Sequence, residues 1–147
     1  SFRSSVGKLG SLFDAQTRRL DEPHRALAAC EYLVANCNYD ARGYDSAYSA
    51  LSYGYAGSEG IALAYTELCR QLGIDCTVVY GQLDWADHCW NVIKLDGDYY
   101  HVDVTACIDG GIEAGFLKND EAMWGSYRWN ASDLKPCNGS LSYNDLR

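Results

Sequence analysis

The stretch GYAGSEGIALAYTELCRQLG, residues 54–73, carries the strongest structural pattern in this sequence. Between Ile61 and Leu72, apolar side chains recur at intervals of three and four residues, which is typical of a helix with one buried face. Gly73 follows at the position where glycine commonly ends a helix. The pattern predicts a buried helix from Ser58 to Gly73. Its core side chains are expected to be Ile61, Tyr65, Leu68 and Leu72.

The start of this helix is unusual because Ser58 stands between Gly57 and Gly60, although glycine in a helix is less stable than alanine by up to about 1 kcal/mol. A serine at this place is typical of an N-cap. Alternatively, the glycines allow another group to approach the first turn, where backbone N–H groups and the helix dipole favour negative charge. Ser58 is therefore both a candidate cap and a candidate site residue.

A strand and a hairpin are predicted after the helix. Residues 76–81, CTVVYG, predict a buried strand, and the polar residues 82–87 predict a loop. Two alternating runs, 88–95 and 98–105, flank Asp96-Gly97. An Asp-Gly pair in this context is typical of a two-residue hairpin turn of type I′.

The turn fixes which side chains share a face of the hairpin. With two residues in the turn, Trp90 opposes Asp103 and His88 opposes Thr105. His88 and Asp103 are then diagonal neighbours on one face, with Trp90 beside His88. Asn91 has the opposite parity and is expected to point away. A turn longer by one residue would place His88 and Asp103 on opposite faces.

The rest of the chain is less regular. A helix is predicted from about residue 21, where Asp-Glu-Pro gives a start signal, to about residue 38. The tyrosine-rich residues 39–57 predict a loop with a short helical turn, and residues 119–124 a short capped helix. We expect one domain over residues 1–147, with residues 1–20 as an N-terminal arm. The fold class is α+β, with the 58–73 helix packed on an antiparallel sheet and Val78 and Ile93 in the core.

Composition excludes several classes of function. The net charge is −8 and no basic cluster is present, which argues against nucleic acid as a partner. No apolar run approaches the roughly 18 residues of a membrane span, so no membrane insertion is expected. The seven cysteines include no C-x-x-C pair, so no zinc site is expected. A disulfide between Cys107 and Cys137 is one possible arrangement.

Three of these residues together suggest acyl transfer. Ser58 offers a nucleophile-type side chain at a helix start, and the hairpin offers His88 and Asp103 as base and orienting group. Each has a structural alternative, because a strand histidine often only packs and an aspartate near a hairpin end is usually solvated. The combination favours a site.

The same residues resemble the core of the transglutaminase-like superfamily, which shares its architecture with papain-type cysteine proteases. The matching stretches are Gly54–Gly60, His88–Asn91 and Tyr100–Thr105, and more loosely the segment from Phe116 to Cys137, which is similar to bacterial members. The resemblance implies a papain/transglutaminase-like fold and a Cys-His-Asp triad. His88 matches the family histidine and Asp103 the family aspartate.

Position 58 departs from the family pattern, because Ser58 occupies the place of the nucleophilic cysteine. A thiol at a helix start beside histidine becomes a thiolate near neutral pH, whereas a hydroxyl must lose its proton during attack. Three explanations remain open: an engineered Cys-to-Ser replacement, a natural inactive relative that binds protein, and a working serine variant. We expect Ser58 to cap the helix and to mark the nucleophile's place.

The resemblance implies a domain that acts on protein or peptide amides, by cross-linking or by hydrolysis. A catalytically silent protein-binding or scaffold module is the alternative. The backbone N–H of Ser58 is the first candidate for an oxyanion donor and the hydroxyl of Tyr48 the second, and Trp90 is expected to line the cleft. No metal or organic cofactor is implied. Because bacterial relatives are often exported and the chain begins at Ser1, an extracellular or cell-envelope location is expected.

Overall fold

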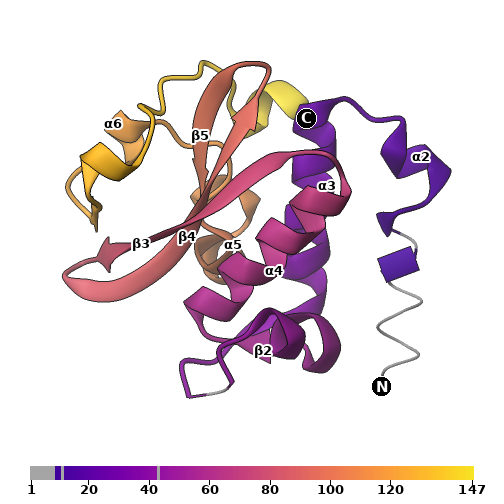
Figure 1. Ribbon diagram of the computed structural model, residues 1–147, viewed down its shortest axis with the longest axis horizontal. Helices are drawn as coiled ribbons and strands as arrows, with labels where there is room; N and C mark the ends of the chain where they lie inside the picture. The colour runs from indigo at the N-terminus through magenta and orange to yellow at the C-terminus, as the bar shows by residue number, and fades with distance from the viewer. Residues whose placement is uncertain (1–8, 11, 43) are drawn as a thin grey trace.

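The structure is a computed structural model that describes residues 9–10, 12–42 and 44–147. Residues 1–8 and 11 of the expected N-terminal arm lie outside the described residues. In the rest of that segment, α2 (Ala15–Arg18) forms one helical turn and Leu12 is buried in the core. Figure 1 shows the main helices packed together against a twisted sheet, which confirms the predicted α+β class.

The helix predicted near residues 21–38 is confirmed as α3 (Glu22–Asn36). The Asp21 carboxylate caps it by accepting a hydrogen bond from the backbone N–H of His24 at 3.0 Å. The following loop contains the expected helical turn, a π-helical segment named η1 (Ser49–Tyr53). On either side of that turn, two short strands pair in parallel. They are β1 (Asn38–Tyr39) and β2 (Tyr55–Ala56).

The central helix α4 (Ser58–Gln71) follows with Gly57 as its N-cap residue. Gly73 comes directly after the C-cap residue and has a φ of 77°, so glycine ends the helix as predicted. The four side chains expected on its buried face are all buried, which confirms the helical pattern. They are Ile61, Tyr65, Leu68 and Leu72.

The main sheet is antiparallel and has the strand order β5-β4-β3-β6. Asp96 and Gly97 both have positive φ and Leu95 pairs with Asp98, so the predicted hairpin turn is confirmed. The four strands are β3 (Asp75–Leu83), β4 (Ala86–Leu95), β5 (Asp98–Val102) and β6 (Tyr127–Arg128).

The predicted loop over residues 82–87 is wrong, because β3 and β4 continue into it and are joined by Asp84 and Trp85 alone. Both residues have positive φ, 49° and 72°. Asp-Trp lacks the glycine that signals such a turn in a sequence, and strand pairing imposes the conformation instead.

The second hairpin strand is shorter than predicted and ends at Val102, so His88 and Thr105 do not pair. Asp103 instead caps α5 (Val104–Gly110), its carboxylate accepting a hydrogen bond from the N–H of Ala106 at 3.2 Å. An aspartate is a strong helix cap, and here it ends the strand despite the β-branched residues around it.

The sheet is covered on both faces. Helices α4 and α5 cover one face, and α3 packs against both of them. Together they form the larger core, which includes Ile93 as predicted. The C-terminal segment covers the other face, where Val79 is buried. Val78 was predicted in the core but is only half-buried. It pairs with Asn91 on the face toward α4, at the edge of β3 that β6 does not cover, whereas Val79 points to the other face and is buried there.

The predicted disulfide option between Cys107 and Cys137 is wrong, because all seven cysteines are free. Cys107 belongs to the helix-side core and Cys137 to the cluster on the opposite face of the sheet, so the two thiols are separated by the sheet.

The C-terminal segment consists of short elements. The capped helix expected over residues 119–124 is confirmed as α6 (Asp120–Met123), whose N-cap Asn119 accepts a hydrogen bond from the N–H of Ala122 at 2.9 Å. Within the described part of the chain, no helix has both the length and the apolarity to span a bilayer. The remaining turns are η2 (Ile112–Ala114), η3 (Ala131–Asp133) and η4 (Tyr143–Leu146).

Candidate active site

Ser58 is the first residue of α4, and its hydroxyl oxygen accepts a hydrogen bond from the backbone N–H of Cys89 at 3.1 Å. The expectation that Ser58 caps the helix is therefore wrong. The cap comes from the preceding loop, where the Asp45 carboxylate accepts a short hydrogen bond from the N–H of Gly60. Helix α4 thus begins with a carboxylate bound to its first turn.

The glycines around Ser58 are explained by this loop. A Cβ atom at Gly60 would lie 2.6 Å from the backbone nitrogen of Ser46, and a Cβ atom at Gly57 would lie 2.9 Å from the Asp45 carboxylate. Residues with side chains would push the loop away from the helix. The glycines therefore let a neighbouring segment approach closely, and the segment belongs to the protein itself.

His88 and Asp103 meet as the hairpin register predicts. The Nε2 atom of His88 lies 2.8 Å from Oδ2 of Asp103, and the two side chains are 10% and 1% exposed. The same carboxylate accepts hydrogen bonds from the Ala106 N–H and, at 2.6 Å, from the hydroxyl of Tyr127. Three groups therefore hold the carboxylate in one orientation.

This geometry leaves Nδ1 of His88 available. If the proton shared with Asp103 sits on Nε2, the neutral ring presents an unprotonated Nδ1. No hydrogen bond in the described part of the chain uses Nδ1, and none joins Ser58 to the ring. His88 lines a pocket of about 320 Å³ together with Tyr80, Gly81 and Cys89. The pocket gives a substrate access to the imidazole.

Tyr127 is a site residue that sequence reasoning missed. Burial and the neighbouring Asp103 carboxylate raise the pKa of its hydroxyl far above the ordinary value, so the group remains a proton donor at all physiological pH values. Tyr127 comes from β6, 24 residues beyond Asp103. Only the loose resemblance of the C-terminal segment pointed to this part of the chain.

Trp90 lies next to His88 as expected, with the two rings stacked at 6.1 Å between centroids. However, Trp90 is only 1% exposed and lies behind the imidazole, so the expectation that it lines the open cleft is wrong. On the face of the sheet toward the C-terminal segment, its ring packs against Tyr127 and Trp129. Trp90 therefore supports the imidazole and does not offer a surface to substrate.

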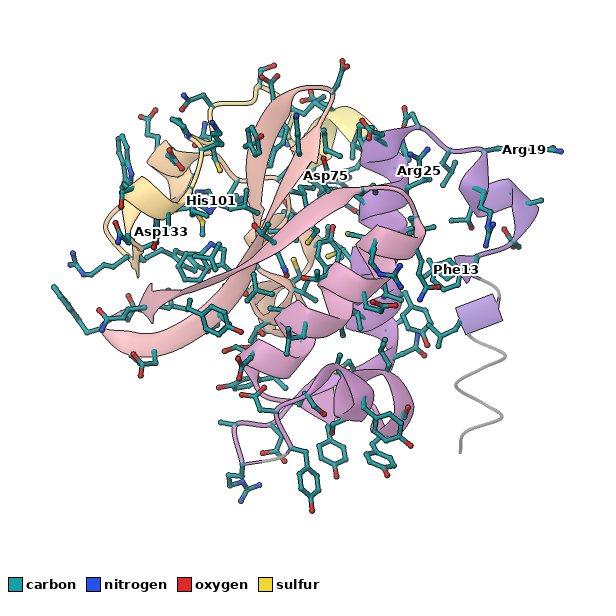
Figure 2. The ribbon with its side chains drawn as sticks, viewed as in Figure 1. Phe13, Arg19, Arg25, Asp75, His101 and Asp133 are labelled. Atoms are coloured by element: carbon teal, nitrogen blue, oxygen red, sulfur yellow. The ribbon has the colours of Figure 1, made fainter. Side chains whose placement is uncertain are left out.

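A buried hydrogen-bond chain continues behind Trp90. Its indole N–H donates to Nδ1 of His101 at 3.0 Å, and Nε2 of His101 lies 2.7 Å from the Asp120 carboxylate. Figure 2 shows His101 on the side of the sheet that faces the C-terminal segment. Burial lowers the pKa of His101, although Asp120 opposes this effect. A neutral His101 with its proton on Nε2 satisfies both partners.

This chain includes a group of metal-type ligands, since atoms of His101, Asp120 and Cys137 lie within 4.8 Å of one another. Their hydrogen bonds argue against a metal site. Both ring nitrogens of His101 are occupied, and both carboxylate oxygens of Asp120 accept hydrogen bonds, one of them from the Cys137 N–H. The group therefore fits a structural network that fixes Trp90.

Asn91 points to the opposite face, as its parity predicts. It is fully buried, and its amide nitrogen lies within hydrogen-bond distance of three acceptors, which its two N–H groups share. They are the carbonyl oxygen of Ala62 and the Thr66 hydroxyl oxygen, both on α4, and the carbonyl oxygen of Thr77 on β3. Asn91 thereby ties the central helix to the strand that carries His88.

Tyr48, the candidate oxyanion donor, is 60% exposed and packs edge-on against Tyr53 with the ring centroids 5.4 Å apart. In the described residues, none of its contacts reaches Ser58 or His88. A catalytic role for Tyr48 therefore has no contact in its favour.

The surroundings of position 58 are negatively charged. The pKa of the Cys89 thiol is raised to about 11, first by burial and then by the charges of Glu59, Asp45 and Asp87, while a hydrogen bond with Ser58 acts in the opposite direction. The charge of Asp45 also offsets the positive end of the α4 dipole. This environment disfavours a new anion near Ser58.

The comparisons with known proteins agree with this geometry. A family model described as the transglutaminase-like superfamily matches residues 12–104, from the buried Leu12 to the residue after Asp103. The chain belongs to the transglutaminase-like superfamily. The catalytic roles of Ser58, His88 and Asp103 remain predictions.

Solved structures with the transglutaminase-like and cysteine-protease-like fold resemble the chain at low identity. The crystal structure of a TGase superposes with a TM-score of 0.58 and 16% identity, over 74% of this chain and 33% of that protein. A proposed cysteine protease from Cytophaga hutchinsonii superposes with a TM-score of 0.53 and 16% identity, over 91% of this chain and 43% of that protein. This chain thus spans less than half of either protein. No curated protein matches the sequence.

Proposed function

We propose that this transglutaminase-like domain carries an acyl-transfer site for protein or peptide amides, with His88 as the base, Asp103 as the orienting group and position 58 as the nucleophile's place. The proposal rests chiefly on the buried 2.8 Å contact between Nε2 of His88 and Asp103, which leaves Nδ1 without a hydrogen bond in a residue that lines a pocket. With Ser58 in the nucleophile's place, the domain does not turn over an amide substrate.

In the proposed reaction, Nδ1 of His88 takes the proton of the nucleophile at position 58 as it attacks the amide carbonyl. Asp103 stabilises the imidazolium that forms, and the backbone N–H of residue 58 donates to the developing oxyanion. The imidazolium then protonates the leaving amine. An amine that attacks the acyl-enzyme gives cross-linking, and water gives hydrolysis. Both outcomes need the same three groups.

Serine is poorly suited to this site. A hydroxyl needs a well-aligned base during attack, and Ser58 is hydrogen-bonded to the N–H of Cys89 and not to His88. The carboxylates around position 58 further oppose the charge that develops on the oxygen.

The test is Ser58→Cys, assayed for amine incorporation and for amide hydrolysis on a library of glutamine-containing peptides. We expect turnover that the present chain lacks, and we expect His88→Ala in the same background to abolish it. Asp103→Asn should lower turnover by several orders of magnitude, because the imidazole loses its orientation and tautomer. A Ser58→Cys variant that folds normally and shows no His88-dependent activity would refute the proposed chemistry.

A second candidate is a catalytically silent module that binds protein or peptide segments at the same pocket. The negative charges of Asp45, Glu59 and Asp87 favour it, because they disfavour anionic intermediates without disfavouring a bound cationic ligand. Peptide binding by the unmodified chain, together with an inactive Ser58→Cys variant, would support this candidate.

A further inference from the structure

The outer edge of β3 is open over most of its length. In the sheet order β5-β4-β3-β6, the outer neighbour β6 pairs with β3 only at Gln82 and Leu83. No other strand in the described part of the chain lies beyond β3, which runs along the outer side of the sheet in Figure 1. An exposed strand edge of this kind is a template for pairing with another extended chain.

The hydrogen bond from the Asp84 N–H to the carbonyl oxygen of Ser126, at 2.9 Å, shows which backbone groups face this edge. Backbone groups alternate along an antiparallel strand, so residues with the parity of Asp84 direct both N–H and C=O outward. These residues include Cys76, Val78 and Tyr80. None of the hydrogen bonds among the described residues uses their outward groups.

A slot runs beside this open edge. The strand residues from Thr77 to Tyr80 form one wall of a pocket of about 230 Å³, and Trp129, Asp133 and Leu134 from the C-terminal segment form part of the other. Figure 2 places Asp133 on that segment, on the side of the molecule where β3 ends. The walls therefore offer backbone pairing on one side and mixed apolar and acidic side chains on the other.

The slot leads to the candidate active site. Tyr80 lines both this slot and the pocket of about 320 Å³ that contains His88. A chain that paired with β3 as far as Tyr80 would end beside the pocket that contains His88, because β6 occupies the edge from Gln82 onward.

The charges along this path are of one sign. Asp133 lines the slot and Asp87 lines the His88 pocket, and neither pocket wall contains a lysine or arginine. Glu59 lies beside Tyr80 and raises the pKa of its hydroxyl to about 12 through a hydrogen bond. None of these three carboxylates belongs to an ion pair within the described residues. A partner with positive charge would complement this path.

We propose that the outer edge of β3, together with the slot between Thr77–Tyr80 and Trp129–Leu134, binds an extended basic polypeptide segment, which adds to the sheet as a strand and leads its chain to His88. Backbone pairing provides the binding energy common to all sequences, and Asp133 and Asp87 select lysine or arginine side chains at alternate positions. The inference deepens the proposed function and rests on it only for the view that the bound segment is a substrate.

The binding test uses the unmodified chain and defined probes. An acetylated, fluorescein-labelled hexapeptide of alternating lysine and valine should bind, as measured by fluorescence anisotropy at low salt. The same peptide with glutamate in place of lysine, or with alternate amides N-methylated, should bind at least about fivefold more weakly, since a charge pair or a backbone hydrogen bond is lost. The lysine peptide should shift the NMR amide signals of Val78 and Tyr80.

Two variants locate the site. Val78→Pro removes the outward N–H, a substitution that the unpaired edge of a strand tolerates, and Asp133→Asn removes one charge from an exposed turn. Each should weaken binding about fivefold or more, whereas Asp98→Asn at the β4–β5 turn should not. Asp133→Asn and the NMR shifts test the site even if Val78→Pro does not fold.

Three results would overturn the proposal: equal binding of the lysine and glutamate peptides, amide shifts that avoid Val78 and Tyr80, or a concentration-dependent dimer that Val78→Pro dissociates. The last result would assign the edge to self-association. Failure of the proposed function is a separate result. If peptides bind but the Ser58→Cys variant is inactive, the docking site stands and the proposed enzymatic function is wrong. If Ser58→Cys turns over substrate and its turnover is insensitive to Val78→Pro and Asp133→Asn, the proposed function stands and the docking site is wrong.

Discussion

The strongest electrostatic prediction concerns a thiol placed at position 58. In Ser58→Cys, the first turn of α4 and a protonated His88 both act to lower the pKa of the thiol from the roughly 8.5 of free cysteine. The Asp45 carboxylate acts against them, because it is bound to the N–H of Gly60 in the same turn. Asp45→Asn keeps a hydrogen-bond acceptor at this place and removes the charge. We therefore expect it to lower the thiol pKa.

The size of this change follows from the geometry. A Cβ atom at Gly57 would lie 2.9 Å from the Asp45 carboxylate. Consecutive Cα atoms are about 3.8 Å apart, and the bonds from each Cα to its Cβ and from Cβ to sulfur add roughly 5 Å, so a sulfur at position 58 lies within about 12 Å of the charge. Two unit charges at about 12 Å interact by roughly 0.3 to 1.4 kcal/mol for effective dielectric constants of about 80 to 20. Asp45→Asn should therefore lower the thiol pKa by a few tenths of a unit to about one unit.

The assay is the rate of iodoacetamide alkylation against pH, with mass spectrometry to separate residue 58 from the seven native cysteines. Asp75→Asn is a matched control, because it removes the same charge from the far end of β3, about 20 Å along the strand from the residue that pairs with His88. It should leave the thiol pKa unchanged. A folded Asp45→Asn variant whose thiol pKa is unchanged or higher would show that the carboxylate does not act on this position.

Other predictions concern the groups around the site. Burial holds the pKa of His101 below its ordinary value near 6.5, so the contribution of His101 to stability is present above that pH and lost as the pH falls. Measured by urea unfolding, the free energy of unfolding of His101→Gln should fall less between pH 7.5 and 5 than that of the unmodified chain. Tyr127→Phe removes a hydrogen-bond donor to Asp103 and should lower the free energy of unfolding by about 1.5–3 kcal/mol. An unchanged midpoint of urea unfolding would contradict this. Gly60→Ala should cost roughly 1–3 kcal/mol in the same assay, since its Cβ would lie 2.6 Å from the backbone of Ser46, and an unchanged stability would show that the loop can move.

The parts of the site that sequence reasoning found depend on local chemistry. Asp96-Gly97 specifies a two-residue turn, and this turn fixes the pairing of β4 with β5. The proximity of His88 and Asp103 follows from that register even though β5 ends at Val102, since one further residue in any extended conformation keeps Asp103 near the same face. The 3.6-residue periodicity of α4 is equally local, and its buried face is confirmed.

The missed features depend on contacts between distant parts of the chain. Asp45 caps α4 from 15 residues before Gly60, and Tyr127 reaches Asp103 from 24 residues after it. Neither residue stands in a pattern that specifies a partner. The choice between strand and helix at Asp103 was also not decided by propensity, because the neighbouring valines favour a strand and the aspartate favours a helix start.

The two halves of the candidate site have opposite electrostatic character. The buried pair of His88 and Asp103 is costly to maintain for stability alone, because apolar side chains of similar volume often serve as well, and its geometry leaves one ring nitrogen beside the pocket. The half around Ser58 carries the charges of Asp45 and Glu59, which oppose the thiolate or oxyanion that such a base would generate. A candidate site that combines an imidazole nitrogen without a hydrogen bond and an anion-disfavouring environment at position 58 is suited to holding a cationic chain beside His88. The Asp45→Asn experiment measures how far that second half opposes acyl transfer.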